Sequence, residues 1–169
     1  FSWVFKRAPN FFDVVCYTGT NANRTLNHNL GVAPELIIVK DRSQAQDWEV
    51  YSATAGATKA LRLNQAVAAF SATTYWNNTA PTSSVFTVGT SSDVNSNGNN
   101  YVAYLFATCA GVSKVGTYSG TGATQTISCG FTGGARFVLI KRTDASGDWY
   151  VWDTVRGMVA GNDKYLLLD

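Results

Sequence analysis

The feature that most constrains the fold is a line of sequence that the chain writes twice. Residues 40–50 read KDRSQAQDWEV and residues 141–151 read KRTDASGDWYV, so Trp48 and Trp149 are 101 residues apart. A period of about 100 residues is much longer than the roughly 20–50 residues of solenoid repeats. Each copy is therefore expected to be a domain-sized unit.

The duplication extends outward from this line in both directions. Three further pairs align, the last of them after a four-residue insertion around GMVAGND: YTGTNANRTL (17–26) with YSGTGATQTI (118–127), ELIIVK (35–40) with RFVLIK (136–141), and KALRLN (59–64) with KYLLLD (164–169). An insertion of this kind belongs in a loop. The repeated unit thus comprises several consecutive segments.

The alignment also assigns the ends of the chain. SWVFK at 2–6 aligns with AYLFA at 103–107 at the same separation. We therefore expect residues 1–10 to hold the closing strand of a preceding unit, residues 11–110 to form one complete unit, and residues 111–169 to form the N-terminal part of a second. The chain is predicted to be a window from a longer tandem array.

Strand signals dominate both copies. Short segments rich in β-branched and aromatic residues are bounded by Gly, Asn, Ser or Pro, namely DVVCYTG, ELIIVKD, DWEVYSA, ALRLN, SVFTVGT and NYVAYLFAT. Only LNQAVAAF at 63–70 has the composition of a short helix, and NSNGNN at 95–100 predicts a hairpin turn. About seven strands in about 100 residues indicate an all-β fold of tandem antiparallel β-sandwich-like units, the second incomplete.

Charge and cysteine content argue against several classes of protein. The net charge is +2 without a polybasic run, which argues against nucleic acid and anionic membrane surfaces as partners. No apolar stretch approaches the ~20 residues of a membrane span. The three cysteines have no CxxC spacing, so neither a disulfide framework nor a zinc site is indicated.

Catalytic constellations are also missing from the sequence. His28 is the only histidine and aligns with Cys129, so the two copies cannot share a histidine-based site. DVNSNG at 93–98 begins like an EF-hand loop, but the twelfth position is Tyr104 instead of glutamate. The acids are few and scattered, whereas glycoside cleavage needs two of them in one cleft. We expect no enzyme activity, no cofactor and no metal.

Aromatic residues beside polar ones form the candidate binding set. Rings pack on the C–H faces of sugars while polar neighbours bond the hydroxyls. The candidate glycan-binding residues are Trp48, Tyr51, Trp149, Trp152, Asp47 and Asp148, with Trp76 and Tyr150 also in this class. Three roles stay open for Trp48 and Trp149: core residue, exposed ligand face, or contact between units or chains.

Several longer phrases carry a resemblance to a known family, including FFDVVCYTGT, NLGVAPELIIVKDRS, NYVAYLFATCAGVSKVGTYSG and GFTGGARFVLIKRTDASGDWYVWDTVRG. They resemble the tandem ~100-residue β-domains of uncharacterised function in large virion proteins of tailed bacteriophages, notably marine and cyanobacterial phages. In that family the arrays often follow a laminin-G or concanavalin-like domain, in tail-fibre or structural proteins. The resemblance supplies no catalytic residues.

The resemblance implies a structural and adhesive segment of a virion appendage such as a tail fibre, exposed on the particle after assembly in the host cytoplasm. The expected partners are further copies of the chain, as in a homotrimer, other virion proteins and host surface glycans. Two alternatives are a purely structural capsid or tail decoration module and a polysaccharide depolymerase domain. Because the second unit lacks its closing strands, we expect it to be ordered by further chain or by neighbouring chains.

Overall fold

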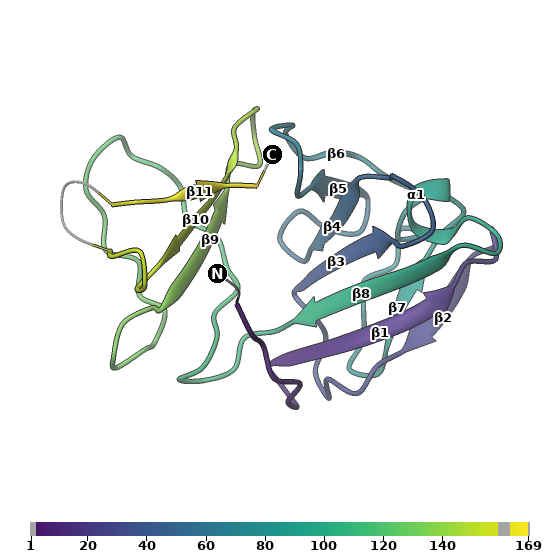
Figure 1. The fold of residues 1–169 in the computed structure, drawn as a ribbon, viewed down its shortest axis with the longest axis horizontal. Helices are drawn as coiled ribbons and strands as arrows, with labels where there is room; N and C mark the ends of the chain where they lie inside the picture. Colours follow the sequence, from purple (N-terminus) through teal and green to yellow (C-terminus); the bar gives the residue numbers. More distant parts are fainter. Residues whose placement is uncertain (1–2, 159–162, 169) are drawn as a thin grey trace.

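The computed structural model describes residues 3–158 and 163–168 and confirms an all-β fold with antiparallel sheets (Figure 1). One short helical turn, α1 (Ser92–Asn95), accompanies the described strands. The strands are β1 (Phe12–Thr18), β2 (Arg24–Asn27), β3 (Leu36–Asp41), β4 (Trp48–Ser52), β5 (Lys59–Arg62), β6 (Phe70–Ser71), β7 (Val85–Val88), β8 (Asn100–Phe106), β9 (Phe137–Lys141), β10 (Trp149–Asp153) and β11 (Leu166–Leu167).

The first copy is built on a six-stranded sheet with the order β1-β8-β3-β4-β5-β6, accompanied by the pair β2-β7. β8, the last strand of this copy, lies between β1 and β3. Its Phe106 is opposite Phe12 of β1 on one edge and opposite Leu36 of β3 on the other. Burial alternates along β8, as its sequence predicts, with Tyr101, Ala103 and Leu105 inside. A central strand such as β8 is buried on one face and paired on both edges.

The main core lies on the inner face of this sheet. It is formed mainly by β1, β3, β4 and β8 together with β2, β7 and the loop between β6 and β7; its largest members are Tyr17, Tyr51, Trp76, Phe86, Tyr101, Ile37, Leu30 and Leu105. Trp76 is buried, packs edge to face on Tyr51 at 5.9 Å, and donates Nε1–H to the Lys59 carbonyl at 3.0 Å. Burial of each large apolar side chain contributes about 1.5–3 kcal/mol to stability.

The second copy contains a three-stranded sheet with the order β11-β10-β9, and its register repeats that of the first copy. Lys141 lies opposite Trp149 as Lys40 lies opposite Trp48. In the next strand pair, Val151 faces Leu166 as Val50 faces Leu61. The duplicated sequence therefore encodes the same three-stranded meander twice.

The duplicated lysine explains part of the repeated wording. Lys40 Nζ donates to the carbonyl of Gln46 at 2.8 Å, across the loop between β3 and β4. Lys141 Nζ donates to the carbonyl of Gly147, the position equivalent to Gln46. A charged donor on the last or second-last residue of one strand thus closes the loop that leads into the next strand.

The two sheets pack on each other through a second apolar cluster. The face of the first sheet that points away from the main core packs against the corresponding face of the second sheet. Val50, Leu61 and Trp149 are buried at the centre of this cluster, with Leu36, Ile38, Leu63, Ala69, Leu139 and Leu168 around them. The indole Nε1–H of Trp149 donates to the Arg62 carbonyl at 2.7 Å. Two backbone bonds, from Gly147 to Ala66 and from Ala69 to Thr143, join the same surfaces.

Two local predictions were wrong, and a third segment did not form the short helix that its composition allowed. Residues 3–7 are not in a strand, although one was expected over 1–6; Phe1 and Ser2 lie outside the described residues. Residues 63–69 form turns and irregular backbone, because they follow β5 and bond the second copy instead of forming a helix. The segment 95–100 supplies a positive φ of 81° at Gly98, but it connects β7 and β8 in different sheets and closes no hairpin.

The second copy also lacks counterparts of β1 and β2. Residues 114–134, which align with them, contain no strand. In the first copy β1 pairs with β8 and β2 pairs with β7. The described part of the chain holds no second β7 or β8, so these segments have no ladder to join.

Candidate functional site

The candidate site is the face of the second sheet that corresponds to the core face of the first. Ile37, Val39 and Tyr51 are buried in the main core. Their counterparts, 101 residues later, are only half-buried: Val138, Ile140 and Trp152. They line a hollow of about 270 Å³ together with Met158 and Asp163.

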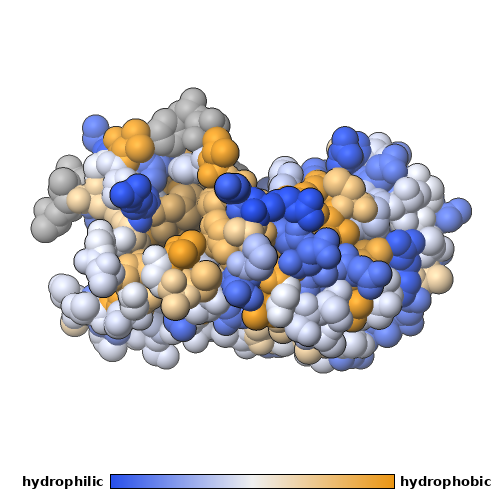
Figure 2. All heavy atoms as spheres, turned by 90° about the horizontal axis from the view of Figure 1, so that it is seen from below, coloured by the Kyte–Doolittle hydropathy of each residue, from blue (hydrophilic) through white to orange (hydrophobic). Residues whose placement is uncertain are grey.

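Apolar surface gathers around a hollow in the part of the molecule that carries β9 to β11, on the left of Figure 2. In the first copy, Trp76 and strand β7 cover the equivalent face. In the second copy, none of the described residues replaces them. A half-open apolar hollow that also holds one carboxylate, Asp163, has the composition of a ligand-binding or docking surface.

Three aromatic rings lie together on this face. Tyr150 and Trp152 point the same way from β10 and stack with their centroids 5.5 Å apart and their planes at 16°. Tyr165, which precedes β11, lies 5.3 Å from Tyr150 and 6.2 Å from Trp152, and is 52% exposed. The alternation of β10 accounts for the pair, because residues two apart share a face of the sheet. The rings offer flat apolar surface of the kind on which a sugar ring packs.

The six residues predicted as a glycan site do not form one site. Trp152 lies on the open face, but Tyr51 is buried against Trp76 in the main core. Trp149 is buried between the two sheets. This is the contact between units, one of the three roles left open for it. Side chains alternate between the two faces of a strand, so Trp149 and Trp152, three positions apart, lie on opposite faces.

The remaining three predicted residues lie elsewhere. Trp48 is half-buried and lies nearly parallel to Tyr104, at 6.5 Å and 14°. Asp47 accepts hydrogen bonds from Asn64 at 2.8 Å and from Gln65 at 2.9 Å. Asp148 is half-buried directly before β10. Asp47 thus orders a turn of the first copy.

Sequence reasoning missed Tyr165 and Asp163. Asp163 ends the segment GMVAGND, which holds the four-residue insertion, and Tyr165 follows it, where the separation between copies has changed from 101 to 105 residues. Tyr165 aligns with Ala60, so nothing in the first copy marks that position as aromatic. The one available signal was the alternation of side chains along the predicted strand at 164–168, which places Tyr165 on the same face as Trp152.

His28 has a structural place at the end of β2. It is buried, its Nδ1 accepts from the Leu30 amide at 3.2 Å, and its Nε2 lies 3.2 Å from the Thr82 carbonyl. These contacts use both ring nitrogens and correspond to a neutral imidazole that donates from Nε2. They hold the chain between β2 and the start of β7.

A buried carboxyl lies on the inner face of β4. Glu49 is fully buried, its Oε1 lies 3.1 Å from Arg62 Nε, and its Oε2 has no hydrogen-bond partner in the described structure. Burial raises the pKa of Glu49 to about 7, against the opposing effect of Arg62. Arg62 also meets Asp47 at 3.3 Å and Asp93 at 3.9 Å. Within residues 3–158 and 163–168 no group of three or more His, Cys, Asp or Glu residues could hold a metal ion.

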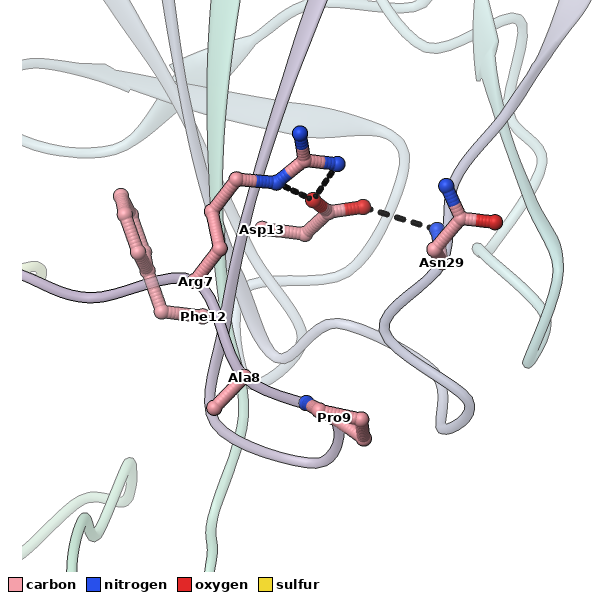
Figure 3. A pocket seen from close by; sticks show the side chains of 6 residues that line it. All are labelled: Arg7, Ala8, Pro9, Phe12, Asp13 and Asn29. Carbon is pink, nitrogen blue, oxygen red and sulfur yellow. Dashed lines mark hydrogen bonds and ion pairs between the residues drawn. The ribbon is translucent and has the colours of Figure 1, made fainter.

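A second, smaller hollow of about 170 Å³ lies beside the N-terminal segment (Figure 3). Its carboxylate, Asp13, is fully engaged: it meets the Arg7 guanidinium at 2.5 Å and accepts from the amides of Asn29 at 2.7 Å and Val14 at 2.9 Å. Burial alone would raise the pKa of Asp13, but these donors outweigh it and lower the pKa below its usual value. The Arg7–Asp13 ion pair therefore anchors the N-terminal segment to β1, and Asp13 is not a free acid for chemistry in this hollow.

The comparisons with known proteins give a family and no function. No helix in the described ranges has the length and hydropathy to cross a membrane. No curated protein and no solved structure matches the chain significantly. One family model matches residues 2–168 and so includes both copies of the meander. The chain therefore belongs to the family described as a domain of unknown function (DUF7483).

Proposed function

We propose that this chain is a non-catalytic structural and adhesive segment of a bacteriophage virion appendage that binds glycan on the open face of its second sheet. One observation carries the proposal: the sheet face that is filled with protein in the first copy is left half-open by the described residues of the second. The rings of Tyr150, Trp152 and Tyr165 lie there, beside a hollow of about 270 Å³.

The chemistry of the open face suits a sugar. The stacked pair presents a flat apolar surface, and Tyr165 meets it at an interplanar angle of 56°, so the rings form two walls. Asp163 lines the hollow and supplies an acceptor for sugar hydroxyls. Rings give affinity by packing on C–H faces, and a few polar groups give orientation.

The non-catalytic part of the proposal rests on the acids. Among the described residues that line the hollow, Asp163 is the one carboxylate. Glycoside cleavage uses a pair of carboxyl groups about 5–10 Å apart on either side of the bond. The acids around Arg62 are on the inner face of the first sheet, and His28 bonds backbone groups.

The virion role rests on the resemblance in sequence and on the character of the chain: a repeated β unit with a net charge of +2 and a high content of Thr, Ser, Asn and Gly. A purely structural decoration role is the second candidate. Val138, Ile140 and Met158 favour it, because apolar side chains around an open hollow are also suited to burial against another virion chain.

Glycan binding by the purified chain tests the proposal. We expect Trp152→Ala to weaken binding to a glycan found on an array of bacterial surface polysaccharides by about tenfold or more, because it removes one stacked ring. Trp48→Ala is the matched control, since Trp48 is also half-buried against an aromatic ring but lies away from the hollow. Trp152→Phe should restore most of the affinity.

Two results would overturn the proposal. One is the absence of binding to every glycan tested; the other is an equal loss for Trp152→Ala and Trp48→Ala. Release of new reducing ends from a polysaccharide would contradict the non-catalytic part and favour a depolymerase.

A further inference from the structure

The first observation is a strand edge that no described strand of the chain occupies. β9 is the last strand in the order β11-β10-β9, whereas its counterpart β3 lies between β4 and β8. An edge strand presents a row of backbone donors and acceptors to any extended segment that reaches it. What pairs with β3 in the first copy shows what kind of segment fits β9.

The second observation is that the chain carries a second β8-like sequence. SWVFK at 2–6 aligns with AYLFA at 103–107, within β8 and just beyond it. In the first copy Phe106 faces Leu36 and Leu105 faces Ile37, in antiparallel register. Transferred by 101 residues, this register places Phe5 opposite Phe137, and Val4 opposite Val138.

The third observation is that the N-terminal segment already contacts Phe137, the first residue of β9. The rings of Trp3 and Phe5 lie 5.4 Å and 5.9 Å from the ring of Phe137, both edge to face. Their exposed fractions alternate with that of Val4, at 37%, 89% and 39% for residues 3, 4 and 5, as in an extended strand with one face covered. The segment therefore has side-chain affinity for this edge.

In its own molecule, however, the segment does not pair with β9. No ladder joins residues 3–7 to β9 in the described structure. Phe5 is also held by Phe12 and Phe106 of the first sheet, each at 5.6 Å. Just beyond it, the Arg7–Asp13 ion pair ties the chain to the start of β1. These contacts hold the segment away from a ladder with β9 of its own molecule. The segment of a second copy can approach the edge of β9 from outside, because it is attached to a different first sheet.

We propose that the edge of β9 accepts residues 3–6 of a second copy of this chain as an added antiparallel strand, in the register that β8 adopts on β3. The alignment identifies the segment that would occupy this edge, because within the given sequence only the N-terminal segment resembles β8. The contact joins the start of one copy to the second sheet of another, so it is head to tail. It either repeats as an open chain or closes into a ring, depending on the rotation between copies. It is strand addition, with main-chain bonds for affinity and alternate side chains for register.

This contact deepens the proposed structural role, because it gives a way for copies to associate into an array. It does not depend on glycan binding, since it uses the edge of β9 and not the rings of Tyr150, Trp152 and Tyr165. Loss of glycan binding in Trp152→Ala and loss of chain association are therefore separate results.

Disulfide trapping between copies tests the register. In a background with Cys16, Cys109 and Cys129 replaced by serine, one batch carries Val4→Cys and the other Val138→Cys. Residues directly opposite in an antiparallel pair have Cα atoms about 4.5–5.5 Å apart, within disulfide range, whereas a position two residues further along is about 7 Å or more away. We expect the mixture, under mild oxidation with glutathione disulfide, to give a linked heterodimer, and at least about fivefold less with Ile140→Cys as the off-register partner.

The double variant Val4→Cys, Val138→Cys should give linked dimers or a ladder of longer linked chains. Phe5→Pro added to this double variant should remove the linked species, because proline lacks the amide that strand addition uses and disfavours a paired position. Two results would overturn the proposal: a double variant that forms only monomers with an internal disulfide, or a mixture whose heterodimer does not exceed the off-register control. The sizes of the linked species on a gel run without reducing agent distinguish all of these outcomes.

Discussion

Equivalent residues of the two copies have very different environments. Tyr17 and Leu26 of the first copy are 8% and 7% exposed, whereas Tyr118 and Ile127, their counterparts in the second, are 50% and 47% exposed. The local sequence is identical at five of ten aligned positions, 17–26 and 118–127. The difference teaches that these side chains are core residues only where β7 and β8 are present to pair with the segments that carry them.

The meander behaves differently, because its contacts are local. β9 and β10 pair across a loop of seven residues, as the six-residue loop between β3 and β4 allows in the first copy. The pairing of β1 with β8 joins Thr18 to Asn100, which lie far apart in the chain. Short loops cost little entropy to close, so the meander forms in each copy, whereas the distant pairings require a specific partner.

The largest expected contrast comes from the core of the first copy. Trp76→Ala should lower the free energy of unfolding by about 3–5 kcal/mol, because it leaves a cavity beside Tyr51 and removes the bond to the Lys59 carbonyl. Tyr118→Ala should change it by less than about 0.5 kcal/mol, as expected of an exposed position. Urea denaturation of both variants measures the difference; similar losses would break the comparison.

The pH dependence of stability should also belong to the first copy. Glu49 is buried, with Arg62, Asp47, Asp93 and Tyr75 in its surroundings, and its folded pKa is raised from 4.5 to about 7. A raised carboxyl pKa means that the contribution to stability is complete below pH 4.5 and is lost as the pH rises through 7.

Glu49→Gln should remove this loss, which is on the order of 2–3 kcal/mol between pH 4.5 and pH 8. Thermal unfolding across that pH range measures it, with Asp144→Asn of the second copy as the control because Asp144 is exposed. A Glu49→Gln protein whose stability falls with pH as steeply as the original chain would contradict the assignment.

A pair of glycines gives the smallest contrast. A Cβ on Gly19 would lie 2.1 Å from the Ser96 carbonyl oxygen, so Gly19→Ala must displace backbone, at a cost of about 1–3 kcal/mol. A Cβ on Gly120, its counterpart, would meet no atom within 4 Å. Gly120→Ala should therefore be neutral or stabilise by up to about 1 kcal/mol. Equal destabilisation by the two substitutions, measured by urea denaturation, would show that a covering segment lies over both glycines.

The sequence predicted the all-β fold and the repeated meander, because alternation and the constant separation act through local pairing. It could not place residues 3–7, whose strand-like composition lacks a partner ladder in this chain. It also could not divide the aromatic residues into core and surface. Trp149 and Trp152 have similar neighbours in sequence, and only the packing of one sheet on the other buries the first and leaves the second half-open.

Hydrogen exchange of the dilute, monomeric chain tests the central contrast between a closed first copy and an open second copy most directly. We predict that amides of β1 and β8 exchange at least about a hundredfold more slowly than those of residues 113–134, because only the former lie in a ladder over a buried core. Protection of residues 113–134 equal to that of residues 12–27 would contradict the account, since it would mean that the second copy is closed without the strands that close the first.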